Sequence, residues 1–192
     1  MTVFNTEVSA IQVDGDNVIT KRPMDCLRWR EIVERHSETK FIVTIRDPRS
    51  MVTSRHPVFE RYTASWDHYL AGHEDPIEFE PGGIVNLARH IREMEPFAEI
   101  VRYEDLTADP QAVQRRLGRL GLAFCGTFET FHEREPGDWP ALGGKRPPDP
   151  KGKEKWRNDP DRIREQFTAC PELFDLVEEY GYEPDRSWFE AL

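Results

Sequence analysis

A short apolar run that ends in a charged turn is the feature of this sequence that most restricts its fold. Residues 41–45 (FIVTI) are apolar or β-branched and too few for a helix, so they fit a strand buried on both faces of a parallel sheet. The run ends at Arg46. Because Pro48 disfavours helical geometry for Asp47 but is tolerated in a first helical turn, Asp47 is predicted to be the N-cap of a helix that reaches about Arg55. The stretch therefore predicts a strand, a turn and a helix N-terminus.

The carboxyl end of this strand is a candidate site for an anion. Arg46 lies there beside the backbone N–H groups that open the helix, and both these donors and the helix dipole favour negative charge. Ser54, eight residues later, adds a hydroxyl donor, and an arginine fork with a hydroxyl suits a phosphate. An arginine at a strand end also often pairs with an acidic residue of its own chain, which contains 36 Asp and Glu. Residue types alone leave both interpretations open.

Two stretches, in matching order, resemble the sulfotransferase family. Residues 46–49 (RDPR) followed by Ser54 are similar to the family segment that holds the 3′-phosphate of 3′-phosphoadenosine 5′-phosphosulfate. Residues 100–106 (IVRYEDL), then Asp109-Pro110 and a helix that ends in residues 120–122 (LGL), resemble a second family stretch. This second stretch mainly marks the fold, so its acidic pair is expected to be structural, with a hydrogen-bonding role for Glu104.

A third and weaker match lies in a basic part of the chain. Lys151, Gly152 and Lys153 ahead of Trp156 resemble the basic, glycine-containing loop and following tryptophan that close over the nucleotide in the family. Six basic residues fall between positions 145 and 157, whereas the chain as a whole has a net charge of -10. A basic island in an acidic protein can be a solvated face, but beside a phosphate-binding loop it is expected to hold an anion.

The resemblance also points to residues for the chemical step. Lys21 stands where family lysines approach the sulfuryl group as it moves; an exposed charge at a strand end is the other interpretation. His56, two residues after the phosphate segment, is the best candidate for a general base, since histidine has a suitable ordinary pKa. It begins an irregular stretch, rich in proline and glycine, that is expected to lie over a cleft and select the acceptor. Surface histidines are the alternative there. Pro23 occupies a place where some family members carry a base, and proline cannot take a proton.

Length and periodicity predict one α/β domain over residues 1–192. The resemblance implies a parallel sheet flanked by helices in three layers, the P-loop-NTPase-like sulfotransferase fold, in a full, minimal or truncated form. Short strands are expected within residues 8–20 and a further strand over residues 98–103. Helices are expected over residues 24–36, 84–94 and 110–120, and after Pro160 and Pro171. The last two helices are expected to cover one face of the sheet.

Composition argues against several other classes of protein. The net charge of -10 disfavours nonspecific binding to nucleic acid or to an anionic membrane. The sequence shows neither a membrane-spanning apolar run nor the pattern of a signal peptide, so a cytoplasmic protein is expected. The three cysteines stand far apart and suggest neither a disulfide framework nor a zinc site. No metal-ligand motif occurs, and no metal is expected to be required.

One departure from the family concerns the loop that cradles the 5′-phosphosulfate. A Gly/Ser/Thr-rich turn between a strand and a helix is required there, and residues 1–20 contain no such turn. The chain begins after that loop, uses residues 14–17 in its place, or has lost the reaction. The first function implied is sulfuryl transfer to a hydroxyl or amine of a small-molecule or glycan acceptor. The alternative is a non-catalytic nucleotide-binding or protein-interaction module. The sequence does not indicate the acceptor or the oligomeric state.

Overall fold

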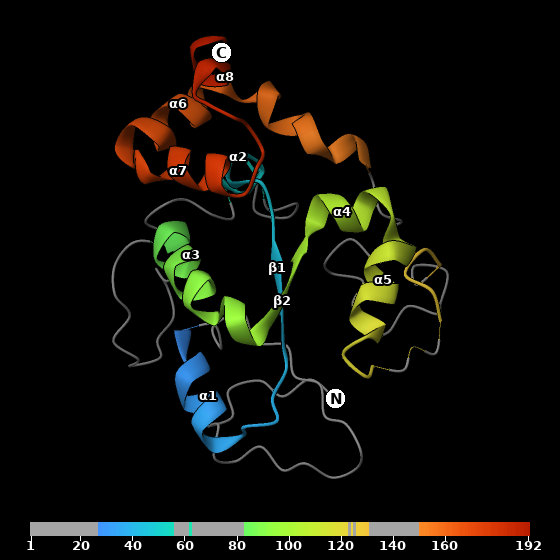
Figure 1. The fold of residues 1–192 in the computed structure, drawn as a ribbon. Helices are drawn as coiled ribbons and strands as arrows, with labels where there is room; N and C mark the ends of the chain where they lie inside the picture. The colour runs from blue at the N-terminus through green and yellow to red at the C-terminus, as the bar shows by residue number, and fades with distance from the viewer. Residues whose placement is uncertain (1–26, 56–61, 63–82, 123, 125, 131–149) are drawn as a thin grey trace.

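A computed structural model of the chain describes residues 27–55, 62, 83–122, 124, 126–130 and 150–192 (Figure 1). Labels α, β and η denote α-helices, strands and 3-10 helices. The elements in chain order are α1 (Trp29–Arg35), β1 (Phe41–Ile45), α2 (Pro48–Val52), α3 (Gly83–Met94), η3 (Glu95–Phe97), β2 (Ala98–Arg102), α4 (Tyr103–Ala108), α5 (Pro110–Gly118), η6 (Pro150–Asn158), α6 (Pro160–Ala169), α7 (Glu172–Glu179) and α8 (Ser187–Glu190).

Strands β1 and β2 pair in parallel, with Phe41 opposite Ala98 and Ile45 opposite Arg102. The strand predicted over residues 41–45 is therefore confirmed with its bounds. Because the pairing is parallel and in step, both strands end at the same edge of the sheet. The residues that follow them, Arg46 and Tyr103, consequently emerge side by side.

Helices pack against both faces of this two-stranded ladder (Figure 1). One face joins β1 to α1 and α3 through the buried side chains of Trp29, Val43, Ile45, Ile91 and Met94. The other face joins β2 to α5 through Val101, Val113 and Leu117. The amphipathic pattern predicted for α3 is confirmed, since Ile84, Ala88, Ile91 and Met94 are buried and Arg89, Arg92 and Glu93 are exposed. Leu87 is only half-buried, however, and the polar Asn86 is buried as well. The strands predicted within residues 8–20 lie outside the described residues.

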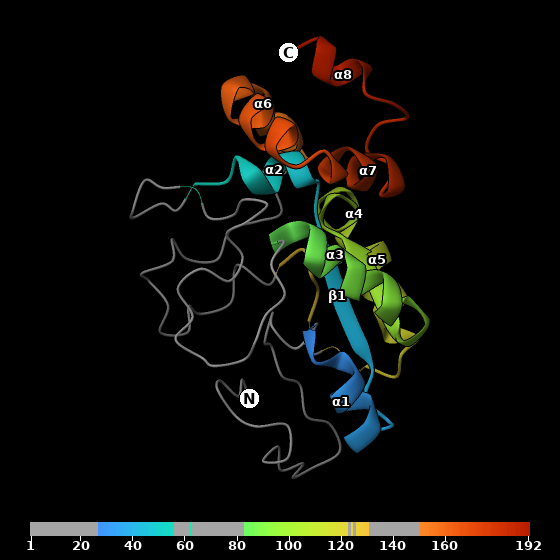
Figure 2. The same ribbon diagram turned by 90° about the vertical axis from the view of Figure 1, so that its left-hand side faces the viewer.

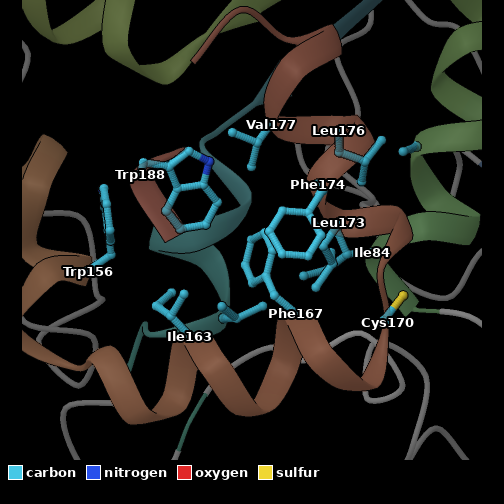
Figure 3. Close-up of a cluster of buried hydrophobic side chains, with 12 residues drawn as sticks. Ile84, Trp156, Ile163, Phe167, Cys170, Leu173, Phe174, Leu176, Val177 and Trp188 are labelled. Atoms are coloured by element: carbon cyan, nitrogen blue, oxygen red, sulfur yellow. The ribbon is translucent and has the colours of Figure 1, made fainter. Parts of the chain in front are cut away.

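Helices α6, α7 and α8 lie beyond the carboxyl end of β1 (Figures 1 and 2), and the largest apolar cluster of the described residues is centred on them. It joins α2 and α3 to the C-terminal helices, and Figure 3 shows its centre. The buried members are Val52, Ile84, Ala88, Trp156, Ile163, Phe167, Cys170, Leu173, Phe174, Leu176, Val177 and Trp188. Helices α6 and α7 begin as predicted, but the expectation that they cover a face of the sheet is wrong. Both helices pack against α2, and α7 also packs against α3, because their apolar residues share one cluster with those of α2 and α3.

The predicted helix caps are also present. Asp47 Oδ1 accepts the N–H of Arg49 at 2.9 Å, and Asp109 Oδ1 accepts the N–H of Ala112 at 2.8 Å. Each carboxylate satisfies a donor that has no partner inside its helix. Gly121, which follows α5, has a φ of 87°, a left-handed conformation that glycine adopts without strain.

Helix α2 ends at Val52, three residues before the predicted end at Arg55. The N–H of Ser54 donates to the carbonyl oxygen of Met51 at 3.2 Å. This bond spans three residues instead of four, so the last turn tightens and the helix stops. Ser54 therefore lies beyond the helix, although the predicted end at about Arg55 would have included it.

Three other elements are shorter than predicted, and the first of them, α5, ends at Gly118 instead of residue 120. Helix α1 begins at Trp29, because Arg28 has a φ of -116° and a ψ of 16° that do not continue a helix. Residues 24–26, the predicted start, lie outside the described residues. Strand β2 ends at Arg102, because Tyr103 opens α4.

Replacing Phe167 by alanine should destabilise the protein by about 3–5 kcal/mol, because the ring is fully buried and its loss leaves a cavity. Its centroid lies 5.0 Å from that of Phe174 and 5.3 Å from that of Trp188. Chemical denaturation followed by circular dichroism measures the change. Thr168→Ala, at the exposed neighbouring position on α6, is the matched control and should stay within about 0.5 kcal/mol. Equal effects of the two substitutions would contradict the packing described.

Candidate anion-binding site

Arg46 is the first residue after β1, and its side chain is half-buried. Its guanidinium lies over the ring of Tyr103, 4.9 Å from the centroid. Within the ranges that the structure describes, no carboxylate forms an ion pair with Arg46. Stacking uses the face of a guanidinium, so the N–H groups in its plane remain suited to a planar or tetrahedral anion.

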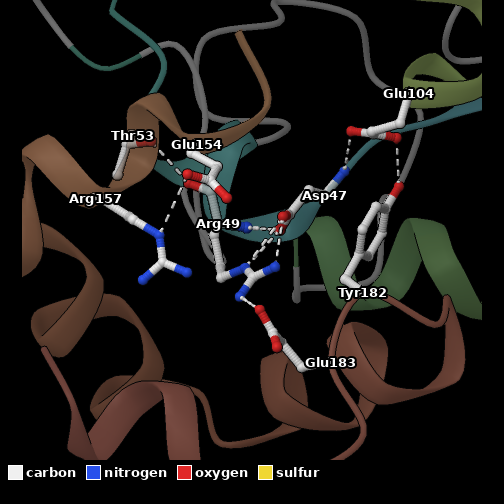
Figure 4. Close-up of polar contacts among 8 residues, drawn as sticks. All are labelled: Asp47, Arg49, Thr53, Glu104, Glu154, Arg157, Tyr182 and Glu183. Carbon is white, nitrogen blue, oxygen red and sulfur yellow. Dashed lines mark hydrogen bonds and ion pairs between the residues drawn. The ribbon is translucent and has the colours of Figure 1, made fainter. Parts of the chain in front are cut away.

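The N-terminus of α2 is occupied by carboxylates of the chain itself (Figure 4). The N–H of Asp47 donates to Glu104 Oε1 at 3.3 Å, and the N–H of Arg49 donates to Asp47 Oδ1. Pro48, between them, has no N–H. Two of the backbone donors that the prediction offered to an anion are therefore taken by side chains of the chain itself. Two acidic side chains compete successfully for the donors, and one of them, Glu104, comes from a distant part of the sequence.

Arg49 is a structural residue of this turn. It is 3% exposed, and its Nη2 lies 2.8 Å from Asp47 Oδ2 while its Nη1 lies 2.5 Å from Glu183 Oε1. Its guanidinium also stacks over two rings, 4.1 Å from the centroid of Trp156 and 4.7 Å from that of Trp188. The structural ion pair that was left open for Arg46 is thus made by Arg49, three residues later.

The charge of Arg49 is secured by its neighbours. Burial alone would lower the pKa of Arg49, but hydrogen bonds and charge attraction from Asp47 and Glu183 raise it above its ordinary value. The guanidinium therefore stays protonated and keeps both carboxylates in place. Its hydrogen-bonding capacity is directed to these acids, which makes it a poor candidate for holding a ligand.

Glu104 connects the turn to the segment that follows α7. Its Oε1 accepts from the backbone of Asp47, and its Oε2 accepts the hydroxyl of Tyr182 at 2.7 Å. Glu104 is only 8% exposed, so these bonds satisfy a buried carboxylate. Burial and the bond to Glu104 raise the pKa of Tyr182 far above its ordinary value, so the phenol remains a donor. The predicted hydrogen-bonding role of Glu104 is confirmed.

The structure brings the elements of three predicted ligand groups together. Arg46 precedes α2, Ser54 follows it, and η6, which begins with Pro150 and contains the Lys151-Gly152-Lys153 segment, contacts both α2 and α4. Ser54 is half-buried. The other two candidates, Lys21 and His56, lie outside the described residues.

Trp156 does not fit the prediction that it covers a nucleotide. Its side chain is 2% exposed and packs between the guanidiniums of Arg49 and Arg157. It also meets the ring of Trp188 edge-on, with 5.5 Å between centroids. Trp156 therefore fixes η6 to the protein core instead of facing a ligand.

Sequence reasoning missed the partners from the C-terminal segment, namely Tyr182, Glu183 and Trp188. In the sequence they belong to an acidic stretch with no motif of its own. The available signal was indirect: an arginine that is buried beside a strand end requires carboxylates, and Asp47 alone leaves part of its fork unpaired.

Two negative findings apply to the described residues only. They contain no group of three or more His, Cys, Asp or Glu that could hold a metal ion. None of their helices has the length and apolar character needed to span a bilayer.

Comparison with known proteins adds one match. The model of the sulfotransferase family matches residues 3–126, which is more than half of the chain. The matched range includes Arg46, Ser54 and Glu104 and ends before η6. No curated protein and no solved structure matches the chain.

Replacing Arg49 by alanine should destabilise the protein by about 3–5 kcal/mol, because it leaves two acidic partners without a counter-charge in a buried setting. Arg186→Ala is the control, since its ion pairs with Asp175 and Glu178 are exposed and should contribute at most about 1 kcal/mol. Urea denaturation of both variants measures the difference. A loss in Arg49→Ala no larger than that in the control would show that the buried ion pair does not support the fold.

Proposed function

Because the chain belongs to the sulfotransferase family, we propose that it transfers a sulfuryl group from 3′-phosphoadenosine 5′-phosphosulfate to a hydroxyl or amine of a small-molecule or glycan acceptor. The observation that carries the proposal is the state of Arg46, which stacks on Tyr103 and has no carboxylate partner among the described residues. It stands at the carboxyl edge of two parallel strands, where open α/β sheets bind their ligands. We assign the 3′-phosphate to Arg46 and Ser54.

We further propose that the parallel ladder is part of the three-layer, P-loop-NTPase-like sheet of this family. The in-step pairing of β1 and β2 and the helices on both faces support this. In such a sheet the 5′ end of the nucleotide would lie at the same edge as Arg46.

The reaction that we propose exchanges one bond to sulfur for another. The acceptor oxygen or nitrogen attacks the sulfur, the bond from sulfur to the 5′-phosphate oxygen breaks, and the acceptor proton passes to a base. We assign this base to His56, and we assign to Lys21 the balance of negative charge on the leaving phosphate. Catalysis rests on positioning and charge stabilisation, and no metal is invoked.

The basic segment on η6 is assigned to the nucleotide as well. Lys151, Gly152 and Lys153 belong to the first part of η6, which contacts both α2 and α4. These two helices border residues 46–49, the Arg46 turn. Trp156, at the other end of η6, anchors this element in the core. A fixed basic element beside the turn would raise the local concentration of an anionic donor in a protein of net charge -10.

A non-catalytic module that retains the nucleotide or binds a protein partner is the second candidate. The observation in its favour is the absence of a Gly/Ser/Thr-rich phosphate loop in residues 1–20. Consumption of the sulfated donor separates the two candidates, because a binding module need not turn anything over.

Calorimetric titration should show that the protein binds 3′-phosphoadenosine 5′-phosphate more tightly than adenosine 5′-phosphate. Arg46→Ala should weaken binding of the first nucleotide roughly 10- to 100-fold, because a charge-assisted contact is worth about 1.5–3 kcal/mol. The second nucleotide should be affected little. Arg35→Ala, an exposed arginine on α1 at the far end of β1, is the control and should leave both affinities unchanged (Figure 1). Failure of the intact protein to bind either nucleotide would overturn the proposal.

Incubation with the sulfated donor and a panel of hydroxyl and amine acceptors should release 3′-phosphoadenosine 5′-phosphate. Lys21→Ala should lower kcat by about 10²–10³-fold, since it removes charge stabilisation of the transition state, while affinity for the bisphosphate product changes less. Chromatographic detection of the released product measures the rate. Tight donor binding without turnover for any acceptor would favour the non-catalytic candidate.

A further inference from the structure

Two consecutive residues that follow helix α7, Tyr182 and Glu183, have their side chains directed towards the Arg46 turn. Gly181 N–H donates to the Glu178 carbonyl oxygen at 2.9 Å, and Tyr182 N–H donates to the Val177 carbonyl oxygen at 2.9 Å. With Gly181 at a φ of 69°, this pair of bonds is a Schellman motif, which ends the helix and reverses the chain. Tyr182 and the residue after it consequently leave α7 in a fixed direction.

Tyr182 and its neighbour Glu183 are linked by hydrogen bonds to the two ends of the Arg46 turn (Figure 4). Tyr182 donates to Glu104, whose other oxygen accepts the N–H of Asp47. Glu183 accepts from Nη1 of Arg49 at 2.5 Å. The two contacts therefore bracket residues 47–49, immediately after Arg46.

The direction of the Arg46 side chain depends on this turn. Arg46 shares a peptide bond with Asp47, whose N–H is held by Glu104 at 3.3 Å. Loss of the Tyr182 hydroxyl would leave the Glu104 carboxylate with fewer partners and freer to rotate. The Asp47 peptide group would then be held less firmly, and the guanidinium of Arg46 would adopt a wider range of orientations.

We propose that Tyr182 and Glu183 are positioning residues that hold the Arg46 turn in the geometry that recognises a 3′-phosphate. The inference rests on the proposed function and deepens it. Both residues lie outside residues 3–126, the range matched to the sulfotransferase family. They touch Glu104 and Arg49 and act through them, without contacting the ligand.

The test compares binding of 3′-phosphoadenosine 5′-phosphate and adenosine 5′-phosphate to the full chain. The ratio of the two affinities reports recognition of the 3′-phosphate and is independent of how much protein is folded. Tyr182→Phe keeps the ring over Arg102 and removes only the hydroxyl, so it should lower this ratio about fivefold. Tyr180→Phe, the same substitution two residues earlier on a tyrosine that packs in the apolar clusters, is the control and should leave the ratio unchanged.

A second pair of variants tests the other contact. Glu183→Ala should lower the ratio, and Glu183→Gln, which retains an oxygen to accept from Arg49, should restore most of it. Amide hydrogen exchange supplies a readout without ligand: the Asp47 N–H should exchange faster in Tyr182→Phe than in the intact protein, while amides in the centre of α6 should not.

The outcomes separate the inference from the proposed function. A lowered ratio in Tyr182→Phe, together with faster exchange at Asp47, supports the positioning role. An unchanged ratio, or a lowered ratio with unchanged exchange at Asp47, overturns it and leaves the proposed function standing. No binding of either nucleotide by the intact protein overturns the proposed function, and the inference falls with it.

Discussion

The buried ion pairs of Arg49 are the interaction on which this part of the protein depends. A guanidinium that is 3% exposed is tolerable only when its charge and its donors are matched, and Asp47 and Glu183 supply that match. Because Trp156 and Trp188 stack on the same guanidinium, η6 and α8 are fixed by it as well. One side chain thus ties α2 to the last third of the chain.

Arg46 and Arg49 are three residues apart but have opposite electrostatic environments. Arg49 forms ion pairs with two carboxylates and stacks on two aromatic rings. Arg46 stacks on Tyr103 and forms no ion pair with an acid among the described residues. In a chain of net charge -10 this separation matters, since most cations are drawn to the abundant acids. The proposed anion site at Arg46 is consistent with this division, because Arg49 already pairs with the carboxylates of Asp47 and Glu183.

Local rules predicted much of the fold and little of the site. The bounds of β1, the caps Asp47 and Asp109, and the buried face of α3 all follow from spacing over a few residues. Contacts with residues far along the chain could not be predicted from local patterns. The carboxylate of Glu104 accepts the N–H of Asp47, which is 57 residues away in the sequence. Helices α6 and α7 share an apolar cluster with α2 and α3 beyond the end of the sheet. The binding roles of Arg46, Ser54 and residues 151–153 and the catalytic roles of Lys21 and His56 remain predictions.

The sequence distance between Arg49 and Glu183 also sets the order in which the turn can be completed during synthesis. The two residues are 134 positions apart. At ordinary rates of translation, Glu183 is added on the order of ten seconds after Arg49. Throughout that interval the arginine can pair with Asp47 but with neither Glu183 nor Trp188. A nascent chain that already carries β1, β2 and their helices therefore still lacks the partners that complete the turn after Arg46.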